Sequence, residues 1–167
     1  MYHVGQMKTE PTRQAQVRRL QETLAVVGGG VIAFGTWSLV KIALLFALYN
    51  EEAVYRLFHI DSGTPFSIAF VVTIFVACSD LLIRSFVGLS ARAEGHGEKK
   101  GNFYLFVAGF IAIANVISIV SLAFGPSVNL SLFDAAVSVA IDATSFATLI
   151  LMIRSAVRLR QLNRQTE

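Results

Sequence analysis

The stretch FSIAFVVTIFVACSDLLIRSFVGL, residues 66–89, decides the fold class of this chain. Its only charged residues are Asp80 and Arg84, and the rest of it is apolar or weakly polar. A helix rises about 1.5 Å per residue, so a stretch of this length can cross a hydrocarbon layer about 30 Å thick. An extended strand in its place would leave backbone groups unpaired in lipid. The stretch therefore predicts a transmembrane helix.

Three further stretches have the same character and length. They cover residues 24–49, 103–124 and 132–153. We predict an all-α integral membrane protein, a four-transmembrane-helix bundle with short loops, whose transmembrane domain spans 24–153. A cytoplasmic N-terminal amphipathic segment at 1–23 and a basic cytoplasmic tail at 154–167 would flank this domain.

The overall composition agrees with a membrane protein and excludes some functions. Of the 167 residues, 54% are hydrophobic and 15% are charged, against about 25% charged in a typical soluble domain. The single cysteine, Cys78, excludes an intrachain disulfide and a zinc site built on thiolates. The net charge of +3 comes mostly from arginines that flank the spans, so we expect no nucleic-acid partner.

Lysine and arginine are distributed unevenly between the two sides of the predicted spans. Most of them lie in the N-terminal segment, in the loop 90–102 and in the C-terminal tail. These residues are Lys8, Arg13, Arg18, Arg19, Arg92, Lys99, Lys100, Arg154, Arg158, Arg160 and Arg164. The other two loops hold only Arg56. The positive-inside rule then predicts a multi-pass protein of the cell membrane with both termini in the cytoplasm, where its basic residues would meet anionic headgroups.

Two cytoplasmic segments allow more than one interpretation. The N-terminal segment is either a helix on the membrane surface or a continuation of the first span beyond the bilayer. The loop 90–102 is rich in glycine and charge, which predicts a flexible, solvated connection. Glu94, His96 and Glu98 alternate within it, but three ligands without a partner motif are a weak metal signal. We expect no metal site.

Charged side chains inside the spans are the strongest functional indication, because each costs about 2.5–3.5 kcal/mol on insertion scales. Lys41, Asn115 and Asp142 fall at similar estimated depths in three different spans. We predict that Lys41 and Asp142 pair, with Asn115 hydrogen-bonding nearby, since pairing relieves the desolvation of both charges. Asp80 and Arg84 are four residues apart on one helix and predict an intrahelical pair, which stabilises a helix end or acts as a gate.

The fourth span carries a polar stripe on one helical face. Its members are Asp134, Ser138, Asp142, Ser145 and Thr148. Such a stripe cannot face lipid. It either packs against other helices or lines a path for an ion or proton.

Three classes of function compete. We favour a transporter or channel-like subunit with a polar path along the fourth span, and the alternative is an accessory, structural or regulatory subunit of a larger membrane complex. Because four helices enclose little space, we expect a homo-oligomer or a subunit of a complex. An enzyme is the least favoured class, since the chain lacks the HExxH, nucleophile-elbow and phosphate-loop motifs. All histidines lie outside the spans, so we expect no haem and no other cofactor.

Overall fold

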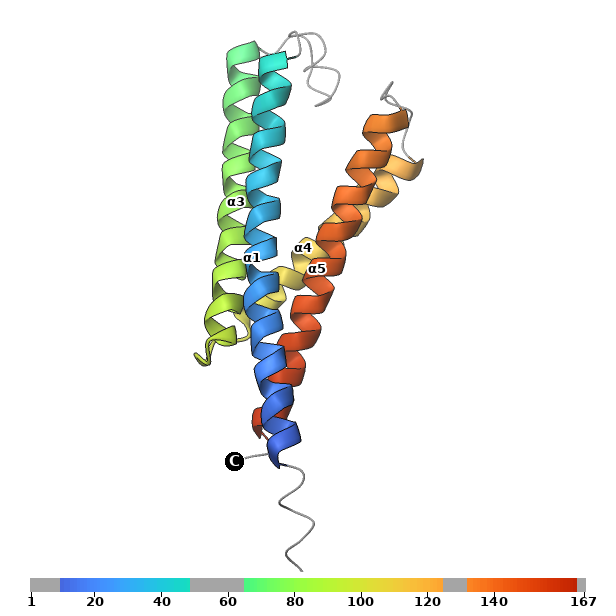
Figure 1. Ribbon diagram of the computed structural model, residues 1–167. Helices are drawn as coiled ribbons and strands as arrows, with labels where there is room; N and C mark the ends of the chain where they lie inside the picture. Colours follow the sequence, from blue (N-terminus) through green and yellow to red (C-terminus); the bar gives the residue numbers. More distant parts are fainter. Residues whose placement is uncertain (1–9, 49–64, 125–131, 165–167) are drawn as a thin grey trace, which may run out of the picture.

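The structure is a computed structural model that describes residues 10–48, 65–124 and 132–164. Within these ranges all regular secondary structure is α-helical (Figure 1). The helices are α1 (Glu10–Leu48), α3 (Phe66–Gly95), α4 (Phe103–Phe124) and α5 (Leu132–Arg164). Each contains a segment long and apolar enough to cross a membrane. The prediction of an all-α chain with four such helices is confirmed.

The helices continue beyond the predicted spans at one end of the molecule. Helix α1 runs from Glu10 through residue 24 without a break, so the N-terminal segment continues the first span within the described residues. Helix α5 likewise continues past residue 153 to Arg164. We call this end, where α1 begins and α5 ends, the basic end, because most lysines and arginines of the chain gather there.

The connection between α3 and α4 corrects the prediction of a flexible loop at 90–102. Residues 90–95 are the last turns of α3, and Gly97 then adopts a left-handed backbone conformation with φ of 91°. The backbone N–H of Glu98 donates to the carbonyl of Ala93, and that of Gly97 donates to the carbonyl of Glu94. This is a Schellman motif, which uses glycine because other residues are strained at positive φ. We had interpreted the glycines of this loop as a sign of flexibility, but one of them, Gly97, ends helix α3.

The four helices form two pairs that meet at the basic end and separate toward the other end, which we call the open end. Helix α1 packs along α3, and α4 packs along α5, while α1 also contacts α5 (Figure 1). The large fully buried side chains include Leu24, Val87, Tyr104, Leu149 and Met152, most of them in the basic half. The hydrophobic core therefore holds the two pairs together mainly at the basic end.

Glycine allows α1 and α3 to approach closely. A Cβ atom added at Gly88 would lie 2.5 Å from the carbonyl oxygen of Gly28, and one at Gly95 would lie 2.8 Å from that of Gln21. These contacts recur one heptad apart along the antiparallel pair, which is the repeat of helices that wind around each other. The glycines at 28 and 88 thus belong to a tight helix crossing, as small residues do between membrane helices.

Candidate functional site

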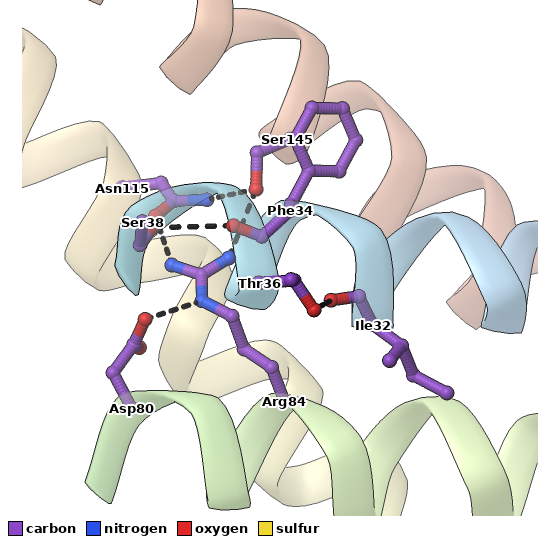
Figure 2. Close-up of polar contacts among 8 residues, drawn as sticks. All are labelled: Ile32, Phe34, Thr36, Ser38, Asp80, Arg84, Asn115 and Ser145. Carbon is purple, nitrogen blue, oxygen red and sulfur yellow. Dashed lines mark hydrogen bonds and ion pairs between the residues drawn. The ribbon is translucent and has the colours of Figure 1, made fainter. Parts of the chain in front are cut away.

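Arg84 of α3 makes hydrogen bonds that connect three helices, α3, α4 and α5. We call the set Asp80, Arg84, Asn115 and Ser145 the Arg84 node. Arg84 Nε donates to Asp80 Oδ2 at 2.8 Å, Nη1 to Ser145 Oγ at 3.1 Å and Nη2 to Asn115 Oδ1 at 3.5 Å. Asn115 Nδ2 also donates to Ser145 Oγ at 3.1 Å. Figure 2 shows these side chains converging from α3, α4 and α5.

Burial explains why Arg84 needs all three partners. Its side chain is only 11% exposed, and Asn115 and Ser145 are buried. A charge in such surroundings is costly unless its donors are satisfied. Helix α1 packs directly over the node, because a Cβ at Gly35 would lie 3.2 Å from the Cβ and Cδ of Arg84. The Asp80 side chain is 37% exposed, so the carboxylate is the accessible member of the node.

The structure brings together residues that the sequence assigned to different groups. The intrahelical contact of Asp80 with Arg84 is present, and Asn115 and Ser145 join it from the neighbouring helices. Sequence reasoning had associated Asn115 with Lys41 and Asp142 by depth alone. Depth does not report the rotation of a helix about its axis, and that rotation directs Asn115 toward Arg84.

The remaining candidates lie on the same helices but outside the node. Asp142 Oδ2 accepts a hydrogen bond from Ser118 Oγ at 3.2 Å. Lys41 is exposed and lies in the C-terminal part of α1. Its pairing with Asp142 stays a prediction.

The polar stripe of α5 contributes differently along its length. Thr148 faces α1, because a Cβ at Gly30 would lie 3.5 Å from its methyl carbon, and its hydroxyl donates to the carbonyl of Thr144. Ser145 belongs to the Arg84 node, and Asp142 contacts α4. Asp134 and Ser138 lie in α5, but their side chains are outside the described residues. Each of these three described stripe residues therefore contacts another helix.

A second polar cluster lies at the basic end, and the sequence analysis missed it. Arg160 grips Glu94 with two donors, Nε to Oε1 at 2.6 Å and Nη2 to Oε2 at 2.8 Å. It also donates to the side chain of Asn102 and to the carbonyls of Lys100 and Gly101 at 3.1 and 3.3 Å. We call this set the Arg160 cluster. It ties α5 to the turn between α3 and α4.

Tyr104 completes the Arg160 cluster. Its hydroxyl donates to Glu94 Oε2, and its ring centroid lies 5.7 Å from Arg160 Cζ, within cation–π distance. Glu94 is therefore a buried carboxylate rather than the solvated loop residue that we had expected. One signal could have found it. Val87, Ala91 and Glu94 follow helical spacing on the buried face of α3, so that the face extends past residue 89.

A hollow of about 430 Å³ lies beside the Arg84 node, between α1 and α3. Its lining is mostly aliphatic, with two hydroxyl groups and one carboxylate, and we call it the α1–α3 hollow. The lining residues are Ser38, Ile42, Val72, Thr73, Val76, Ala77 and Asp80. The hollow places the accessible carboxylate of the node next to an apolar surface.

The fold and the two clusters define the class to which the chain belongs. Over its described residues it is all-helical, with four candidate membrane-spanning helices and two arginine-centred polar clusters. Among the described residues, no group of three His, Cys, Asp or Glu side chains is placed to hold a metal ion. No family model, curated protein or solved structure matches the chain.

Proposed function

We propose that this chain is a multi-pass protein of the cell membrane with cytoplasmic termini, and that it acts as a transporter or channel-like subunit. Insertion in a bilayer is supported by large apolar side chains that are exposed on the surface of the helices. Phe75, Phe106 and Phe110 are each about 70% exposed, and such a surface is unusual for a soluble monomer. The basic end would face the cytoplasm by the positive-inside rule.

The observation that carries the transport proposal is the position of the Arg84 node. The node joins α3 of one helix pair to α4 and α5 of the other, and its carboxylate, that of Asp80, is 37% exposed. On the other pair, Ser118 and Asp142 form a second polar contact on the open side of the node. Polar groups at this depth are costly unless they face protein or water. We infer a polar route that enters from the open end and stops at Arg84.

The basic end would keep this route closed in the present conformation. The Arg160 cluster and the hydrophobic core join both pairs there. Each pair is also well packed internally, so passage would require one pair to rock against the other, as helix bundles of transporters do. The contacts that would break include those of Arg84 with Asn115 and Ser145, because they join the pairs at the node.

Flux measurements in vesicles test the proposal. The purified chain would be reconstituted with K⁺, Na⁺, H⁺ or Cl⁻ gradients across the membrane. We expect flux of at least one ion that is lost in Arg84→Gln and kept in Arg18→Gln, whose arginine is exposed on α1 and paired only with Glu22. Absence of flux above empty vesicles for all four ions would overturn this proposal.

An accessory subunit remains the second candidate, and the separation of the two pairs favours it. A helix of a partner chain seated between the pairs would cover Asp80 and Asp142 and satisfy them. The mass of the particle extracted in native lipid distinguishes the two functions. A multiple of the chain's own mass supports a self-assembled transporter, whereas a constant additional mass supports a subunit of a larger complex.

A further inference from the structure

We propose that the α1–α3 hollow binds a hydrophobic organic cation and that Asp80 is its counter-ion. This inference goes beyond the proposed function, because the ligand would occupy the hollow beside the ion route and is not the transported ion. Binding itself can be measured without any transport.

Asp80 offers a carboxylate that is only partly used. Arg84 Nε engages Oδ2, and an ionised carboxylate has about four lone-pair positions. Arg84 itself does not line the hollow, because its other donors are turned toward Asn115 and Ser145 on the far side. A ligand in the hollow therefore meets the negative member of the pair first. Coulombic attraction is stronger at such a partly exposed site on a protein than in bulk water.

The other lining groups select against anions. The hydroxyl of Ser38 donates to the carbonyl of Phe34, which leaves its oxygen as an acceptor toward other groups. None of the described lining residues is basic. Lys41 is adjacent to Ile42 in the chain but does not contribute to the lining. An anion would thus meet a carboxylate in a lining that has no basic side chain, and like-charge contact of this kind is costly.

The apolar lining selects a ligand with hydrocarbon around its charge. Ile42, Val72, Val76 and Ala77 form most of the wall, and the volume lies within the range of about 300–1,000 Å³ that is usual for small-molecule sites. A hydrated inorganic cation would gain nothing from these side chains. An organic ammonium or phosphonium ion would gain both apolar contact and charge pairing.

Equilibrium binding to the full chain in lipid nanodiscs tests this inference. The probe is tetraphenylphosphonium, and tetraphenylborate is the anion of matched shape. Empty nanodiscs report partition into lipid, which is subtracted. We expect saturable binding of the phosphonium and none of the borate. Asp80→Asn should weaken binding by about tenfold or more, which is the effect of losing one charged partner.

Two further variants keep the test decisive. Glu22→Gln removes the same charge from an exposed site on α1 and should bind the phosphonium as the original chain does. Val76→Trp fills the hollow but keeps Asp80, and Val76 is 60% exposed, so that the larger side chain displaces no core residue. We expect Val76→Trp to weaken binding as well, and it decides the question if Asp80→Asn does not fold.

The outcomes separate this inference from the transport proposal. Saturable binding that is unchanged in a folded Asp80→Asn or in Val76→Trp, equal binding of borate, or no saturable binding would overturn the hollow as a cation site. Ion flux that depends on Arg84 would survive any of these results. Conversely, if binding depends on Asp80 but no ion flux is found, the cation site is supported and the transport proposal is contradicted.

Discussion

The two arginine clusters differ in the strength and the number of their partners. Arg160 has a carboxylate gripped by two donors, an amide side chain and two backbone carbonyls, all at the basic end. Arg84 has one single-donor contact with a partly exposed carboxylate and two neutral partners at 3.1 and 3.5 Å. Charged, two-pronged contacts are the stronger kind. The two helix pairs are therefore joined more strongly at the basic end, by the Arg160 cluster, than at the Arg84 node.

This difference suggests a division of roles. The buried core and the Arg160 cluster stabilise the basic half, whereas the Arg84 node joins the pairs where they separate. A conformational change is expected at the weaker contacts, those of the Arg84 node, because such regions open at a lower free energy. The following substitutions compare the two clusters and are ordered from the largest expected effect to the smallest.

Breaking the Arg160 cluster should have the largest effect. Glu94→Gln leaves the guanidinium of Arg160 without its charged partner in a site where Glu94 is nearly buried. We expect a loss of about 3–5 kcal/mol in the free energy of unfolding, measured by denaturant titration in micelles. The matched control is Glu98→Gln, because Glu98 is 63% exposed and pairs only with Lys100. Equal stability of the two variants would contradict the anchoring role.

Separating α1 from α3 should have the next effect. Gly88→Ala places a methyl group 2.5 Å from the carbonyl oxygen of Gly28, so the helices must move apart. We expect a loss of about 1–3 kcal/mol. Gly29→Ala is the control, since its Cβ would meet nothing within 4 Å and alanine favours a helix over glycine by up to about 1 kcal/mol. Thermal unfolding of the two variants should shift in opposite directions.

The Arg84 node should be less important for stability than the Arg160 cluster. Asn115→Ala removes hydrogen bonds to Arg84 and Ser145, each of which contributes about 1 kcal/mol. Combined with Ser145→Ala, it should show a non-additive effect, because both residues belong to one network. A double-mutant cycle of unfolding free energies measures this coupling. Strict additivity would mean that the node does not act as a unit.

The smallest effect concerns Asp142, for which the sequence and the structure suggest different partners. The hydrogen bond from Ser118 predicts that Ser118→Ala and Asp142→Asn are coupled. We expect a coupling free energy of less than about 1 kcal/mol in unfolding. The depth argument predicts coupling of Lys41→Met with Asp142→Leu instead, so that the double variant recovers much of the folded yield. Measuring both cycles in the same lipid tells which pairing operates. Absence of coupling between Lys41 and Asp142 would remove the predicted charge layer.

The helices and the polar residues within them could be predicted from the amino-acid sequence alone. In a hydrocarbon environment a long apolar stretch such as 66–89 can satisfy its backbone hydrogen bonds only as an α-helix. The presence of a helix and its approximate position therefore follow from composition. The pair of Asp80 and Arg84 was also predictable, because residues four apart on one helix are neighbours whatever the rest of the chain does. Contacts within one helix depend only on its period.

Which helices share these polar groups depends on how the helices pack. Asn115 and Ser145 come to Arg84, and Glu94 comes to Arg160, across sequence separations that helical periodicity cannot encode. Those contacts depend on how each helix is rotated and where the pairs cross, which glycines such as Gly28 and Gly88 set by permitting close approach. Depth along a helix can be counted from the sequence, but the direction that a side chain faces is settled by packing.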